Sequence, residues 1–233
     1  MPFELDHLFI CTEVGAPAAK QLTQFGLREG SANVHPGQGT ANRRFFCQNL
    51  MLELLWVHNA AEAQAEATRP THLWERWSGR AQAACPFGLC LRPSPGKEPD
   101  GLPFPAWDYR PTYLPEGLSI PVATNAAVLS EPMLFYLSFA RRQDTYTGAK
   151  AEPLDHVLNQ DRPSEPIALR QVTRVTLTLP SSGPLSEALQ AVVDANLIEI
   201  RAGQGYLMEL GFDGETRSQH QSFHPTLPLV IYW

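Results

Sequence analysis

The stretch His35-Pro36-Gly37-Gln38-Gly39-Thr40-Ala41-Asn42-Arg43 lies between two apolar, strand-like segments of the chain. One of these segments holds Asp6-His7, and the other holds Leu52-Glu53-Leu54. Glycines allow the backbone to double back with positive φ, but folding alone does not require Asn42 and Arg43 beside the turn. We therefore interpret the turn as a binding element, with a purely structural turn as the alternative.

The residues around this turn predict a βαβββ unit over residues 1–60. In the first strand, Phe3 to Thr12, alternation puts His7, Phe9 and Cys11 on one face and Leu8 and Ile10 on the other. The remaining predicted elements are a helix over Ala16 to Phe25 and strands over Leu27 to Val34, Ala41 to Gln48 and Leu50 to Val57.

The last third of the chain, residues 166–233, repeats this pattern in a weaker form. Its predicted elements are a strand over Val172 to Pro180, a helix over Pro184 to Ala195, and strands over Leu197 to Ala202, Tyr206 to Phe212 and Leu227 to Trp233. Residues 61–165 are predicted to be an insert: a helix over Asn59 to Arg80, three strand candidates separated by proline-rich loops, and a polar connection.

Composition narrows the classes of protein. At 233 residues the chain suits one large domain or two small modules. Its net charge of −6 argues against a nucleic-acid partner, and no apolar run reaches the roughly 20 residues of a membrane span. With no signal-peptide pattern at the N-terminus, we expect a cytoplasmic protein. The four cysteines, Cys11, Cys47, Cys85 and Cys90, are predicted to be reduced structural thiols.

Together, the motifs at Asp6-His7, residues 35–42 and Leu52-Glu53-Leu54 resemble those of the vicinal oxygen chelate superfamily, and in particular its glyoxalase-like members with an HPG-x-GTAN turn. The resemblance is good over residues 3–57, loose over 168–233 and nearly absent over 60–165. It implies an α+β fold in which two βαβββ modules, 1–60 and 166–233, form a curved-sheet cup around a divalent metal. The alternative is a ferredoxin-like sandwich with two separate sheets.

Carried over residue by residue, the resemblance makes His7 and Glu53 metal ligands, and imidazole plus carboxylate suits Zn, Mn, Fe or Ni. Glu209 joins them only if Tyr206 to Phe212 is the fourth strand of the second module. In the register that we favour, the fourth strand is Leu227 to Trp233, which supplies no ligand. A core histidine hydrogen-bonded to Glu53 without metal is the competing hypothesis.

Other residues are expected to meet a substrate. His35 is predicted to be a third ligand or a general base, and Glu53 a carboxylate that moves a proton. Asn42 would orient a substrate oxygen. The other substrate-binding candidates are Arg44, Tyr109, Arg110 and Arg174. Two structural alternatives stay open. Arg174 can instead pair with Glu53, and the proline-rich loop that holds Trp107 and Tyr109 can simply pack on the surface.

The resemblance to the superfamily implies two candidate functions. In the first, the protein is a metal-assisted lyase, isomerase or dioxygenase that acts on a small oxygenated organic anion. In the second, it is a metal-free protein of the same fold that binds or sequesters a small molecule. A nucleotide cofactor is not expected, because the chain has no P-loop or dinucleotide fingerprint. Superfamily members often dimerise, so a homodimer is also expected as a candidate state.

Overall fold

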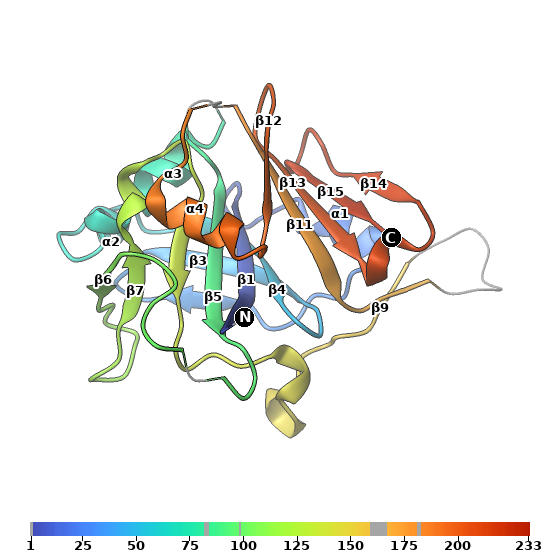
Figure 1. Cartoon of the computed structure of the whole chain (residues 1–233), viewed down its shortest axis with the longest axis horizontal. Coiled ribbons are helices and arrows are strands. Elements are labelled where there is room, and N and C mark those ends of the chain that lie inside the picture. Colours follow the sequence, from blue (N-terminus) through green and yellow to red (C-terminus); the bar gives the residue numbers. More distant parts are fainter. Residues whose placement is uncertain (1, 82–83, 98, 159–166, 181–182) are drawn as a thin grey trace.

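The computed structural model describes residues 2–81, 84–97, 99–158, 167–180 and 183–233. Within these residues an eight-stranded curled sheet is built in the order β2-β3-β4-β1-β5-β8-β7-β6 (Figure 1). Its strands are β1 (Phe3–Cys11), β2 (Asn33–His35), β3 (Thr40–Phe46), β4 (Met51–Val57), β5 (Phe87–Pro93), β6 (Ala106–Tyr109), β7 (Ile120–Ala123) and β8 (Met133–Tyr136).

This sheet consists of two four-stranded units of the same topology. In each unit the first strand pairs in parallel with the last, β1 with β4 and β5 with β8, and the two middle strands lie outside the last one. The first strands of the two units, β1 and β5, pair in antiparallel orientation at the centre of the sheet. The arrangement is compatible with the α+β cup of the vicinal oxygen chelate fold.

The second unit of the cup is therefore residues 87–136, which the sequence patterns had placed in an insert. Residues 166–233, predicted to be that second unit, form a separate five-stranded sheet in the order β12-β11-β13-β15-β14. The bounds of these strands are β11 (Val172–Leu179), β12 (Glu199–Ala202), β13 (Leu207–Phe212), β14 (His220–Ser222) and β15 (Leu229–Tyr232). The short strands β9 (His156–Val157) and β10 (Ala168–Leu169) pair with each other in the connection.

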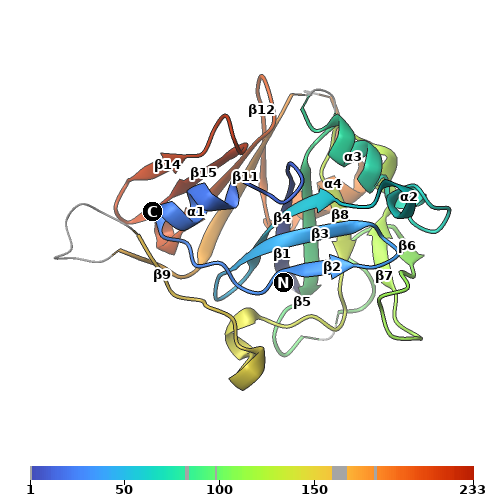
Figure 2. The same cartoon turned by 180° about the vertical axis from the view of Figure 1, so that it is seen from behind.

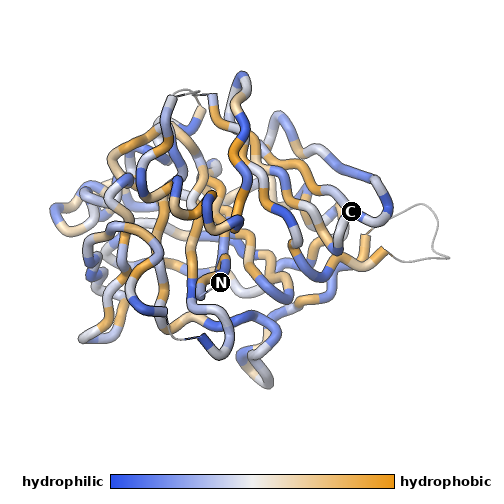
Figure 3. Tube along the Cα trace, viewed as in Figure 1, coloured by the Kyte–Doolittle hydropathy of each residue, from blue (hydrophilic) through white to orange (hydrophobic). Residues whose placement is uncertain are grey.

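The C-terminal sheet covers the outer face of the eight-stranded sheet. The apolar faces of β1, β4 and β5 share one buried cluster with those of β11, β13 and β15 and with helices α1 (Ala19–Phe25) and α4 (Glu187–Asp194) (Figures 1 and 2). Figure 3 shows hydrophobic positions recurring along the strands of both sheets. Alternation thus sends Leu8 and Ile10 into this core and leaves His7 and Phe9 facing the other way.

The helical segment after β4 is broken into short pieces. Its elements are α2 (Ala60–Ala63), a 3-10 turn over Arg69–Thr71 and α3 (Leu73–Gly79). Pro70 and the left-handed His72, with φ of 54°, interrupt the single helix predicted over Asn59 to Arg80. No helix in the described part of the chain is long and apolar enough to span a membrane. All four cysteines are free and buried, as predicted.

The segments that follow the two edge strands of the eight-stranded sheet contact each other. The Thr112 hydroxyl, just after β6, donates to the carbonyl of Pro36 at 3.1 Å, and the Tyr113 hydroxyl donates to Oε1 of Gln38 at 3.1 Å. The rings of His35 and Tyr113 lie 5.1 Å apart. These contacts join the segment that follows one edge strand, β2, to the segment that follows the other edge strand, β6.

His156, fully buried in β9, fastens the connection to the first unit. Its Nδ1 accepts a hydrogen bond from the Arg28 amide at 3.0 Å, and its Nε2 lies 2.9 Å from the Phe46 carbonyl. This pattern requires a neutral ring with its proton on Nε2. Burial lowers the pKa of His156, the Phe46 carbonyl opposes that shift, and the net pKa is below the usual 6.5.

We predict that acidification below pH 6.5 destabilises the protein through His156. Because the unfolded state binds the proton more readily, this contribution to stability is present above pH 6.5 and is lost as pH falls towards the folded-state pKa. His156→Gln should lower the free energy of unfolding by about 1–3 kcal/mol at pH 7.5 and should lose less stability than the native chain between pH 7.5 and 5.5. Urea unfolding measures both effects. The exposed His224→Gln serves as control, and an unchanged pH slope in His156→Gln would contradict the prediction.

Candidate functional site

A cavity of about 490 Å³ occupies the inner face of the curled sheet. Polar side chains of the first unit line one wall, among them Asp6, His7, Asn42 and Glu53. The opposite wall comes mainly from the second unit and is largely apolar; its residues are Tyr109, Tyr113, Leu114, Ile120, Met133, Phe135 and Leu137. A cavity of this size and mixed lining suits a small organic molecule with one polar end.

A β-bulge in β1 puts Asp6 beside His7. The pairing of β1 with β5 shifts register between Leu5 and His7, so Asp6 has no cross-strand partner and escapes the normal alternation. Asp6, only 4 % exposed, accepts from Arg92 Nη1 at 2.8 Å with one oxygen and lies 2.6 Å from His7 Nδ1 with the other. Burial raises the pKa of Asp6, but His7 and Arg92 lower it by more.

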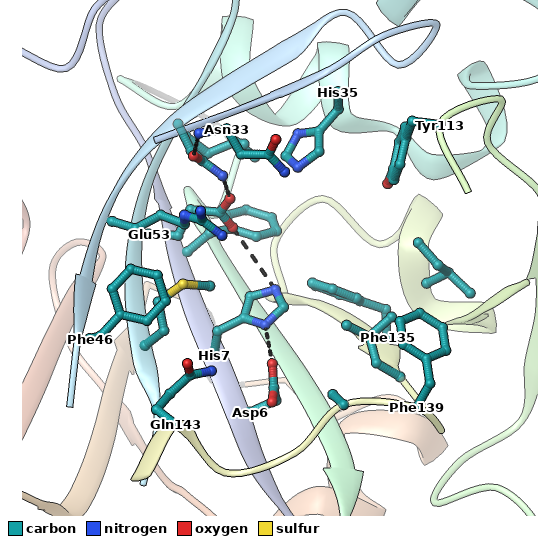
Figure 4. A pocket seen from close by; sticks show the side chains of 18 of the residues that line it. Asp6, His7, Asn33, His35, Phe46, Glu53, Tyr113, Phe135, Phe139 and Gln143 are labelled. Carbon is teal, nitrogen blue, oxygen red and sulfur yellow. Dashed lines mark hydrogen bonds and ion pairs between the residues drawn. The ribbon is translucent and has the colours of Figure 1, made fainter. Parts of the chain in front are cut away.

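His7 and Glu53 point at each other across β1 and β4. Figure 4 shows the line from Asp6 through His7 to Glu53, with His7 Nε2 3.9 Å from Glu53 Oε2. The two residues are 8 % and 5 % exposed. Burial lowers the pKa of His7, whereas its bond to Asp6 and the charges of Asp6 and Glu53 raise it by more, so the net shift is upward.

Asn42 and Arg44 extend the polar wall along β3. The side-chain amide of Asn42 donates to Glu53 Oε1, and its oxygen accepts a hydrogen bond from the backbone N–H of Asn33 at 2.7 Å. Glu53 Oε2 is therefore left facing His7. Arg44 is the cross-strand neighbour of Glu53 and donates to the Ser31 carbonyl at 2.6 Å. Burial lowers the pKa of Arg44, and the charge of Glu53 partly offsets this effect.

His35 stands at the edge of the same cavity. Its Nδ1 lies 2.9 Å from the Thr40 hydroxyl, and Figure 4 shows its ring between Asn33 and Tyr113. Burial lowers the pKa of His35 below its usual value, while the charge of Glu53 opposes the shift. The ring does not join His7 and Glu53 in a close group of ligand atoms among the described residues.

The second unit offers different residues at the positions facing His7 and Glu53. Cys90 of β5 is the cross-strand partner of His7, and Phe135 of β8 is the neighbour of Cys90. The Phe135 ring packs 5.2 Å from the His7 ring, approaching it edge-on. Burial raises the pKa of the Cys90 thiol well above its usual value. The second unit therefore presents an aromatic face and a protonated thiol towards the polar wall.

The structure gathers most of the predicted site residues and leaves three outside. His7, His35, Asn42, Arg44, Glu53 and Tyr109 all line the cavity. Arg174 and Glu209 lie on the C-terminal sheet, where Arg174 pairs with Glu215 at 2.6 Å and Glu209 lies 3.4 Å from Arg201. Arg110 is exposed and pairs with Asp108. The placement of Arg174 and Glu209 at the site is corrected, because residues 166–233 do not build the cup.

Other residues of the site were not found from the sequence as functional. Asp6 was recognised only as part of a motif, since strand alternation would turn it away from His7. Arg92 is 1 % exposed and holds both Glu4 and Asp6, each at 2.8 Å. A lone arginine in the apolar segment of residues 86–93 was the available signal, because a buried guanidinium demands carboxylate partners.

Solved structures with similar coordinates include a hypothetical protein from Staphylococcus aureus, at a TM-score of 0.53 and 9 % identity, covering 98 % of each chain. At that identity the likeness shows a shared fold. A xylose isomerase-like TIM barrel/4-hydroxyphenylpyruvate dioxygenase fusion protein also matches, at a TM-score of 0.46 and 12 % identity, over 91 % of this chain and 36 % of that one. No family model matches the chain, and the search of curated proteins finds no match.

We predict that Arg92→Met destabilises the protein by about 3–5 kcal/mol, because it leaves the buried Asp6 carboxylate without its cation. Chemical unfolding at neutral pH measures this change. The matched variant Arg110→Met removes an exposed ion pair and should change the free energy of unfolding by no more than about 0.5 kcal/mol. Equal effects of the two substitutions would show that the Arg92 pair does not support the site.

Proposed function

We propose that the protein is a metal-assisted enzyme that acts on a small oxygenated organic anion bound in the cavity. The observation that carries the proposal is the buried His7–Glu53 pair, whose Nε2 and Oε2 atoms lie 3.9 Å apart. Imidazole nitrogen and carboxylate oxygen are both ligands of divalent transition metals, so His7 and Glu53 are the residues that would hold such an ion.

The donor set fits a divalent ion such as Zn, Mn, Fe or Ni. Asp6 holds His7 Nδ1 and Asn42 holds Glu53 Oε1, so the remaining donor atom of each ligand is oriented, as the outer contacts of metal sites usually achieve. Asp6, His7 and Cys90 also bring ligand atoms within 4.8 Å of one another. That group suits an ion less well, because both Asp6 oxygens are already engaged by Arg92 and His7.

A bound divalent ion would polarise a substrate oxygen. The other tasks fall to side chains of this chain. Glu53 is the candidate to take up a proton from the substrate; because Asn42 engages Oε1, Oε2 would serve either the ion or the proton. Arg44 contributes the positive charge on the polar wall that an anionic substrate needs, and Tyr109 and Phe135 supply apolar surface for its carbon skeleton.

A metal-free binding protein is the second candidate. The observation that favours it is the pair Cys90 and Phe135, because the second unit offers an apolar ring where a cup with a complete ligand set would need another donor. In this case His7 and Glu53 would recognise a polar group of the ligand directly. A homodimeric state, a cytoplasmic location and the absence of a nucleic-acid partner stay predictions from the sequence.

We predict near-stoichiometric transition metal in protein purified without chelator or affinity tag. His7→Ala and Glu53→Ala should each abolish most of the bound metal, because each removes one of two protein ligands. Elemental analysis of the folded variants gives the stoichiometry. Glu152→Gln is the matched control, since Glu152 lines the same cavity but bonds to Ser31, and it should retain metal.

Two outcomes would count against the enzyme. Native protein that takes up none of Zn, Mn, Fe or Ni, while the cavity still binds small organic acids, would establish the metal-free candidate. Metal that remains in His7→Ala and Glu53→Ala would place the ion elsewhere in the chain.

A further inference from the structure

Three side chains behind His35 form a hydrogen-bonded chain that ends at its ring. The Tyr113 hydroxyl donates to Gln38 Oε1 at 3.1 Å, and Gln38 Nε2 donates to the Thr40 hydroxyl oxygen at 2.7 Å. That oxygen lies 2.9 Å from His35 Nδ1. Gln38 and Thr40 are buried, so solvent does not compete for these bonds.

The direction of these hydrogen bonds determines which ring nitrogen of His35 carries the proton. A hydroxyl has a single proton, and the Thr40 oxygen already receives the Gln38 amide. In the described part of the protein, His35 Nδ1 is the acceptor within reach of the remaining Thr40 proton. If Nδ1 carried the proton, the buried Thr40 hydroxyl proton would have no acceptor among the described residues, so Nδ1 accepts and a neutral His35 carries its own proton on Nε2.

The surroundings of His35 keep the ring neutral. The charged and titratable groups that act on it are Glu53, His7, Arg44 and His58, and burial is the largest influence. The Tyr113 ring, 5.1 Å away, covers one side of the imidazole. Burial also raises the pKa of the Tyr113 phenol, which keeps the donor at the far end of the chain protonated.

The turn holds this arrangement in place. Gly37 and Gly39 have φ of 79° and 75°, and a side chain at Gly39 would collide with the Asn59 carbonyl. The Gly37 amide donates to Glu62 at 2.7 Å, and the Thr68 hydroxyl donates to the Gly37 carbonyl at 3.1 Å. The backbone on the C-terminal side of His35 is thus fixed from two sides.

We propose that His35 is a neutral hydrogen-bond donor which presents its Nε2 proton to an oxygen of the ligand, either a carbonyl or a carboxylate oxygen. His35 lines the cavity, and within the described residues Nε2 has no hydrogen-bond partner of its own. Tyr113, Gln38 and Thr40 are positioning residues that set the tautomer. The identity of the acceptor rests on the proposed function of the cavity, whereas the tautomer does not depend on it.

This assignment separates the roles of the two histidines. His7 Nε2 faces a carboxylate and is suited to an ion or a proton between them, whereas His35 Nε2 carries a proton outwards and is suited to an accepting oxygen. A donor fixed in this way stabilises negative charge that develops on a bound oxygen. The general-base role predicted for His35 from the sequence would need the opposite tautomer.

Long-range proton–nitrogen NMR of ¹⁵N-labelled full-length protein tests the tautomer without metal, substrate or turnover. His35 should show the pattern of an Nε2-protonated neutral ring. The Gln38→Glu variant replaces the amide that donates to Thr40 with a carboxylate that can only accept. The Thr40 hydroxyl should then donate to this carboxylate, and His35 should become protonated on Nδ1. The spectrum is recorded at a pH where the His35 ring is neutral. The control is Gln143→Glu, which makes the same substitution at a residue that lines the same cavity but does not belong to the hydrogen-bonded series. It should leave the NMR pattern of His35 unchanged.

Thr40→Val provides a second variant that removes the partner of Nδ1 and should abolish the preference for one tautomer.

Titration of the native protein with benzoate as a probe oxygen acceptor should shift the signal of the Nε2 proton, and His35→Ala should bind benzoate at least tenfold more weakly. An Nδ1-protonated ring in the native protein, or an unchanged tautomer in Gln38→Glu, overturns the hydrogen-bond chain. A benzoate titration that leaves the Nε2 signal unmoved up to the solubility limit overturns the ligand-facing role. Neither result depends on the metal content that tests the proposed function.

Discussion

A carboxylate buried in the middle of a sheet must be neutralised, and the polar wall of this cavity depends on how Asp6 meets that requirement. Arg92 reaches across from β5 to hold one oxygen, which leaves the other for His7. The imidazole is then fixed with Nε2 towards Glu53, and Glu53 is fixed in turn by Asn42. A connected network of this kind is stable only when every member has its partner.

The cup explains why the polar residues gather on one wall. Both units share a topology, and their first strands pair at the centre, so equivalent positions of the two units face a common space. The first unit contributes His7 and Glu53 to this space, and the residues of the second unit that lie against His7 are Cys90 and Phe135. The two units thus have the same backbone topology but different side chains at the cavity. The first unit contributes the polar residues, and the second contributes mainly apolar surface.

Local patterns predicted β1, β3 and β4, because these strands are seven residues or longer and their alternation shows. The strand predicted over Leu27 to Val34 was wrong in its bounds, since β2 covers only Asn33–His35. The alternation of residues in the segment from Phe3 to Thr12 predicted which side chains lie on each face of β1. The turn at residues 35–43 places His35 and Asn42 at the cavity, as expected. Three strand candidates between Pro86 and Phe139 were predicted, but they were assigned to an insert instead of a second unit, because proline-rich loops separate them. Of the two positions that face the first unit, Cys90 is a ligand-type residue and Phe135 is not. The repeat in residues 166–233 is a repeat of secondary structure, but its strands pair in a different order.

The bulge at Asp6 lay beyond any sequence pattern, since the pairing with β5 creates it. Alternation alone places neighbouring residues on opposite faces of a strand, and a shifted register across β1 and β5 is needed to bring Asp6 and His7 together. The same holds for Arg92, whose partners Glu4 and Asp6 are more than 80 residues away in the chain. Contacts of this range follow from the assembled sheet.

The short edge strands of the molecule have a consequence for how it behaves at high concentration. Exposed strand edges are templates for pairing with other chains, and proteins commonly shorten or cover them. Here both edge strands of the eight-stranded sheet are short, with three residues in β2 and four in β6. The outermost strand β12 of the C-terminal sheet carries Glu199 and Arg201, which discourage a second chain from adding to it. Short edge strands and charged edge residues thus discourage edge-to-edge association of the two sheets with other chains.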